Sequence, residues 1–220
     1  MLFRSVVGTR EQFRDLNVPT YIMPDDCEGK DNLVGADGTR KGAYTPDFLY
    51  KGIAQLAEIF DRRDKGEKLI GDLKARQTKA AEQAKTLDLK GASAVFWFSS
   101  ADLDLDPYVA GKLGPSSYIM NTLGLKNVID SAEEWPTVGW ETIAKANPTY
   151  IVAARMDRRR FPADDIAKKL EFLKSDPVTS QMDAVKNDRI LIMDADAMQS
   201  SLRTIYGMEK LVKDLADLRK

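Results

Sequence analysis

Histidine is absent from this chain of 220 residues, and cysteine occurs once, at Cys27. Because histidine is the commonest general base and metal ligand, its absence excludes a Ser-His-Asp triad, a Cys-His pair and a histidine-built zinc site. One cysteine cannot form an internal disulfide, which fits a cytosolic and a periplasmic protein equally well. Chemistry based on carboxylate, tyrosine, lysine or arginine side chains stays open.

Long apolar runs are also missing, since the longest, at 92–98, is far shorter than the roughly 18–20 residues of a membrane-spanning helix. Residues 1–10 show no basic segment followed by an apolar one, so either export is absent or a leader lies outside this sequence. The 33 basic and 34 acidic residues show no dense basic cluster, which argues against nucleic acid as a partner. Neither GxGxxG nor the phosphate-binding P-loop pattern occurs, which argues against a nucleotide enzyme.

Apolar strands alternate with helices from residue 92 onward. Strands are predicted at 92–98, 127–129, 149–154 and 189–193, and helices at 114–123, 140–146, 163–174, 177–185 and 199–218. This alternation predicts an α/β fold, with a C-terminal three-layer lobe built on a mostly parallel sheet. Ligands of such sheets bind beyond the carboxyl ends of the strands, so the residues just after Phe98, Ala154 and Met193 are candidates for a site.

Mainly helical patterns precede this lobe. A short strand is predicted at 19–23, a helix from Thr45 to about Phe60, and a long charged helix at 65–87. The long helix is either a solvated helix on a domain face or a strut between two lobes. We expect three parts: a remnant of an N-terminal lobe at 1–64, a linking helix at 65–88 and an α/β ligand-binding lobe at 89–220.

Several short sequence motifs, weak singly, are specific in combination. They are GPSSY at 114–118, LGLKNV at 123–128, WETI at 140–143, NPTYIV at 147–152, Asp176-Pro177 and AVKNDRI at 184–190. With the order of elements, these motifs resemble the substrate-binding proteins of ABC importers for iron siderophores, haem and vitamin B12. Nearly all of 45–220 fits this template. The family normally places most of an N-terminal lobe before the point where this sequence starts.

The resemblance implies a non-catalytic component of an ABC importer for an iron complex such as a ferric siderophore. Its expected location is periplasmic or otherwise extracytoplasmic. Its expected partners are the iron chelate and a membrane permease, with no cofactor beyond the iron in the bound chelate. Arg155, Arg158 and Arg203 are candidate ligand-binding residues, because guanidinium groups hold carboxylates, catecholates and hydroxamates through charge-assisted hydrogen bonds. The alternatives are a solvated basic loop for the first two and a surface ion pair for Arg203.

Tyr108, Ser117 and Trp97 are further ligand-binding candidates, which would supply hydroxyl groups and an aromatic wall. Trp97 equally fits the core. Glu141 stands where the family's glutamate docks into an arginine pocket of the permease. An acid in the first turn of a helix is also favoured by the helix dipole alone.

Two other functions compete with ligand delivery. One is a small α/β enzyme that uses Asp102, Asp104 and Asp106 around a divalent ion. The other is a non-binding truncated remnant that self-associates. We also expect a homodimer, since the absent lobe would leave an apolar helix face in water, formed by Leu49, Ile53, Leu56, Ile59 and Phe60.

Overall fold

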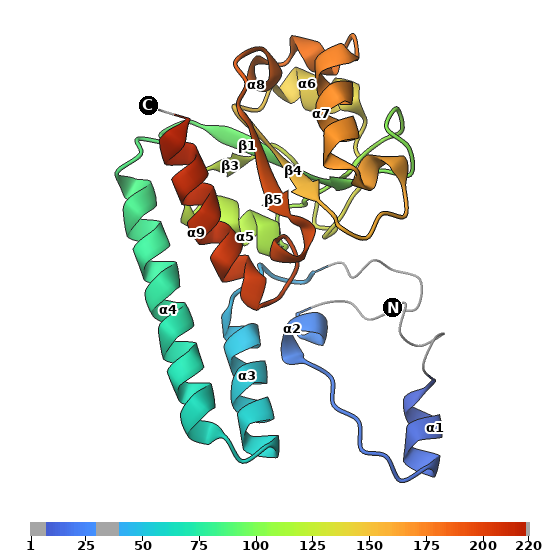
Figure 1. Ribbon diagram of the computed structural model, residues 1–220, viewed down its shortest axis with the longest axis vertical. Coiled ribbons are helices and arrows are strands. Elements are labelled where there is room, and N and C mark those ends of the chain that lie inside the picture. Colours follow the sequence, from blue (N-terminus) through green and yellow to red (C-terminus); the bar gives the residue numbers. More distant parts are fainter. Residues whose placement is uncertain (1–7, 30–39, 219–220) are drawn as a thin grey trace.

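Three of the predicted strands lie side by side in one sheet in the computed structural model, which describes residues 8–29 and 40–218. They are β1 (Ser93–Ser99), β4 (Tyr150–Arg155) and β5 (Ile190–Asp194), all parallel. The strand order is β2-β1-β4-β5 (Figure 1). The sequence did not predict β2 (Tyr108–Val109), which is antiparallel to the end of β1, while β3 (Lys126–Asn127) runs parallel to its beginning.

Helices cover both faces of this sheet (Figure 1). One layer contains α4 (Arg63–Lys85), α5 (Pro115–Thr122) and α9 (Leu202–Asp217). The other contains α6 (Trp140–Ala146), α7 (Ile166–Ser175) and α8 (Asp183–Lys186). Short 3₁₀ turns are η1 (Pro162–Asp164), η2 (Thr179–Gln181) and η3 (Ala195–Ala197). The predicted α/β lobe with a mostly parallel sheet is therefore confirmed.

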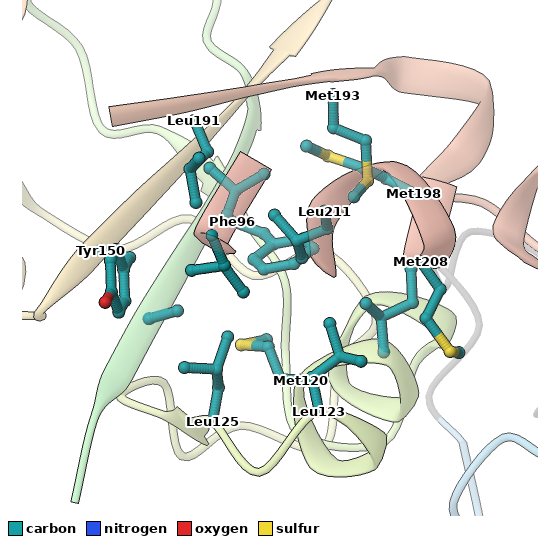
Figure 2. Close-up of a cluster of buried hydrophobic side chains, with 14 of the residues drawn as sticks. Phe96, Met120, Leu123, Leu125, Tyr150, Leu191, Met193, Met198, Met208 and Leu211 are labelled. Carbon is teal, nitrogen blue, oxygen red and sulfur yellow. The ribbon is translucent and has the colours of Figure 1, made fainter. Parts of the chain in front are cut away.

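The strands are buried on both sides because alternate residues enter two separate apolar clusters. Ala94 and Phe96 of β1 face the cluster beneath α5 and α9, and Val95 and Trp97 face the cluster beneath α6 and α7. Figure 2 shows the first cluster, in which Phe96 lies among side chains from α5, β5 and α9. This two-sided burial explains the continuous apolar run in the sequence.

The helices before the sheet pack onto the same chain. The α3 helix (Asp47–Ile59) lies beside α4, and α4 lies along α9 (Figure 1). Leu49 and Ile53 are buried against Leu73 of α4 and Ile205 of α9. The prediction that Leu49 and Ile53 face water is therefore wrong, because α4 and α9 already cover that side of α3.

The predicted strand at 19–23 is also wrong. Residues 17–23 are irregular and connect α1 (Arg10–Asp15) to α2 (Pro24–Cys27). A strand needs a neighbour for its backbone hydrogen bonds, whereas this segment lies beside α3, with the Tyr21 hydroxyl donating to Gln55. The expectation about an export leader was based on residues 1–10, and residues 1–7 lie outside the part of the chain that the structure describes.

None of the helices within 8–29 and 40–218 combines the length and the apolar character that crossing a membrane requires.

Candidate functional site

A pocket lies at the carboxyl ends of β4 and β5, where parallel α/β sheets bind ligands. Its volume is about 630 Å³. It is lined by Phe98 near the end of β1, residues 155–158 from the end of β4 onward, residues 194–196 from the end of β5 onward, and Arg203 in the first turn of α9. The structure therefore brings Arg155, Arg158 and Arg203, predicted separately from the sequence, into one site.

Arg155 and Asp194, which both line this pocket, form an ion pair. They are register partners at the ends of β4 and β5, so the sheet itself sets them opposite each other. Arg155 donates from Nε and Nη2 to Oδ1 of Asp194, at 3.0 and 2.6 Å. Both side chains are about half exposed.

Arg203 is paired in the same way. Its guanidinium donates to the carboxylate of Asp196 in η3. Ser201 caps α9 by accepting from the backbone N–H of Arg203, and its hydroxyl donates to the carbonyl oxygen of Asp196. Arg158 lines the pocket, is exposed and forms no ion pair with the residues that the structure describes.

A buried ionic cluster, formed by Lys169, Asp164 and Ser99, lies at the same end of the sheet. Lys169 on α7 is fully buried and donates to the carbonyl oxygens of Phe98 and Ala154, at 2.5 and 3.0 Å. These carbonyls lie near the ends of β1 and β4, so Lys169 links the two strands beside the pocket.

Asp164 supplies the negative charge of this cluster. Its carboxylate accepts from the Ser99 hydroxyl and from the backbone N–H groups of Arg160 and Phe161, the latter two at 2.7 and 2.9 Å. Burial by itself raises the pKa of Asp164, but these hydrogen bonds and the nearby Lys169 outweigh it and lower the pKa below its usual value. Desolvation lowers the pKa of Lys169 to about 7, against an opposing effect of Asp164.

Three predicted ligand-binding residues lie outside the pocket. Trp97 is fully buried, with its ring 4.8 Å from that of Trp140, and its Nε1 donates to the Ser99 carbonyl. Ser117 is buried in α5. Tyr108 is partly buried in β2, where it pairs with Ser99.

Glu141 is exposed in the first turn of α6, where a partner protein can reach it. Asp102, Asp104 and Asp106 are exposed as well. Within the described ranges, no group of three or more His, Cys, Asp or Glu side chains is arranged to hold a metal ion.

The sequence prediction missed the acidic half of the pocket and the buried cluster. Asp194 and Asp196 lie within three residues after Met193, a position that the sequence analysis singled out, but the pairing of Asp194 with Arg155 arises from the sheet register. Lys169 follows Lys168 in a charged helix and gave no sequence signal of burial.

Comparison with known proteins identifies the family. The family model described as periplasmic binding protein matches residues 2–197, and the chain belongs to this family. Its members bind solutes, catalyse no reaction and carry no cofactor, so the prediction that the chain is not an enzyme is confirmed. No curated protein matches the sequence significantly.

Solved structures share the fold at low identity. A periplasmic binding protein from Veillonella parvula has a TM-score of 0.65 at 23% identity, covering 76% of this chain and 56% of its own. An Fe³⁺-hydroxamate transport protein from Saccharomonospora viridis has a TM-score of 0.73 at 21% identity, over 96% of this chain and 66% of its own. The haem-binding protein RhuT from Roseiflexus sp. RS-1 has a TM-score of 0.71 at 18% identity, over 97% of this chain and 73% of its own. The chain thus spans about half to three quarters of these relatives.

Proposed function

We propose that this protein is a solute-binding component of an ABC importer and that it carries an iron complex, such as a ferric siderophore or a related chelate. The observation that carries the proposal is the pocket of about 630 Å³ at the strand ends, which combines three arginines with the apolar side chains of Phe98 and Met156. Membership of a solute-binding family and structural relatives described as binding haem or transporting Fe³⁺-hydroxamate support the choice of ligand.

The guanidinium groups would hold oxygen atoms of the chelate, and Phe98 and Met156 would contact its apolar parts. The test is a fluorescence-quenching titration with a panel of ferric siderophores and haem. Replacing both Arg155 and Arg203 by Ala is expected to weaken binding at least about tenfold, since each charge-assisted hydrogen bond contributes roughly 1.5–3 kcal/mol.

The matched control replaces Arg14 and Arg63, two exposed arginines outside the pocket, by Ala. This variant loses the same charge and should bind like the wild type. Equal affinities of the two double variants would remove Arg155 and Arg203 from the site, and absence of binding by the wild type across the panel would refute the proposed function.

We further propose that Glu141 contacts the permease from an extracytoplasmic location. Glu141 is exposed and lies outside the pocket lining, so Glu141→Ala should leave ligand affinity unchanged and weaken binding to the permease. A loss of more than roughly 1 kcal/mol in unfolding free energy would instead assign the side chain to helix stabilisation.

We also propose that the protein forms a homodimer. Leu16, Ile22, Ile59 and Phe60 are between 44% and 71% exposed, all in segments before the sheet lobe, and paired copies would cover them. Light scattering at micromolar concentration that shows only a 24.6 kDa monomer would exclude this assembly.

A further inference from the structure

The side chains around the pocket carry no net charge. Three arginines, Arg155, Arg158 and Arg203, face three aspartates, Asp157, Asp194 and Asp196. A pocket built only to attract anions would leave its cations free. Here two of the three cations already have an anionic partner within the protein.

The fold holds both ion pairs in place. Arg155 and Asp194 end adjacent strands in register, and the Asp194 oxygen receives two N–H groups of one guanidinium. Asp196 lies in the η3 turn. Ser201, which accepts from the backbone N–H of Arg203, donates its hydroxyl to the carbonyl oxygen of Asp196 and so keeps the two residues close. Each aspartate therefore stays close to its arginine without any ligand.

An incoming anion has to compete with these aspartates. If it displaces a carboxylate, that carboxylate loses its partner, and if it binds beside the pair, it meets a negative charge at short range. A ligand without net charge avoids both costs, because its oxygen atoms can accept from the guanidinium edges that the aspartates leave open. The half-buried Phe98 and Met156 side chains also favour a ligand with an apolar surface.

We infer that Asp194 and Asp196 are specificity-determining residues, which hold Arg155 and Arg203 and select iron complexes without net charge over polyanionic ones. This inference rests on the proposed function. It makes a ferric trihydroxamate, in which three singly charged groups neutralise the iron, a better ligand than a ferric tricatecholate, which keeps three negative charges.

The experiment titrates the full chain with a neutral cyclic-peptide ferric trihydroxamate and with a trianionic ferric tricatecholate. The wild type should bind the neutral complex at least about tenfold more tightly. Replacing both Asp194 and Asp196 by Asn should raise the affinity for the trianion about tenfold, because both arginines then lack a competing charge.

Two control variants separate pairing from total charge. Asp157→Asn removes a negative charge from the same lining, but Asp157 forms no ion pair within the described residues, so its effect on the trianion should be clearly smaller. Replacing Asp194 and Asp196 by Glu keeps the charges and should keep the selectivity.

Tighter or equal binding of the trianion by the wild type would overturn the inference and leave the proposed function standing. An unchanged trianion affinity in the Asn variant would do the same. If the wild type binds neither complex and no other iron chelate, the proposed function and the inference both fall.

Discussion

Two groups of ionic side chains lie at the same end of the sheet, and solvent reaches them very differently. The side chains of Arg155 and Asp194 are 52% and 56% exposed. Lys169 and Asp164, in contrast, are 0% and 3% exposed as residues. Exposed ion pairs typically contribute about 0–1 kcal/mol to stability, whereas each buried polar group that loses its hydrogen-bond partner costs roughly 1–3 kcal/mol, and more if it is charged.

The two groups have similar chemistry but different roles in the structure. The buried cluster fixes the ends of β1 and β4, because Lys169 bridges their carbonyl oxygens and Asp164 holds the Arg160–Phe161 backbone. The exposed pairs contribute little to the fold, and their aspartates leave part of each guanidinium edge open. One group therefore keeps the pocket wall in place, and the other lines the pocket itself.

The largest expected effect follows from removing the buried carboxylate. Asp164→Ala should lower the free energy of unfolding by about 3 kcal/mol, because two backbone N–H groups and the Ser99 hydroxyl lose their acceptor and the buried Lys169 loses its nearby charge. Urea unfolding followed by circular dichroism measures this. Asp157→Ala, an exposed acid seven residues earlier, is the control and should change stability by less than about 0.5 kcal/mol. Equal effects of both variants would show that the cluster does not stabilise the fold.

A smaller effect concerns Lys169 and pH. Its pKa is about 7 in the folded protein and 10.5 for an ordinary lysine, so between these values the unfolded chain binds a proton that the folded protein does not. Stability must then rise with pH in this window, at most by about 1.4 kcal/mol per pH unit. Well below pH 7, Lys169 is protonated in both the folded and the unfolded protein, so it no longer makes stability depend on pH.

We therefore expect the free energy of unfolding to increase by about 2 kcal/mol from pH 7 to pH 9, and this increase should disappear in Lys169→Met. Restricting the window to pH 9 keeps it below the ordinary tyrosine pKa of 10.0. Above that value the unfolded chain would lose protons that Tyr44 and Tyr50, whose pKa burial raises to about 12, keep in the folded protein. Lys168→Met, an exposed neighbour, is the matched control and should keep the wild-type slope. A slope that persists in Lys169→Met would assign it to other groups.

The same contrast explains what the sequence could predict. The continuous apolar segments at 92–98 and 149–154 made the sheet predictable, because burial on both faces leaves a strong local pattern in the sequence. The two-residue strand β2 has no such pattern, and the irregular segment 19–23 carries strand-forming residues without a neighbouring strand to pair with. Local composition indicates burial, but it does not indicate partners.

The site shows this limit again. The tendency of ligands to bind at the carboxyl ends of parallel strands pointed to Arg155, which lines the pocket, and to the residues after Met193. It could not show that Asp194 is the register partner of Arg155, nor that Lys169 turns inward, since both facts depend on how distant segments meet. Trp97 illustrates the converse, because a residue next to a strand end can still point into the core.

The smallest expected effect concerns the contribution of the exposed Arg155–Asp194 pair to the stability of the fold. Arg155→Gln and Asp194→Asn, made separately, should each lower the free energy of unfolding by less than about 0.5 kcal/mol, since water solvates the partner that is left behind. The double variant should equal the sum of the two, because screened pairs couple weakly. Denaturant unfolding at low and high salt measures both points, and a residual coupling should shrink as salt increases. A loss above about 1.5 kcal/mol for either variant would place the pair with the buried cluster as a structural element, and Arg155 would then not be available to hold a solute.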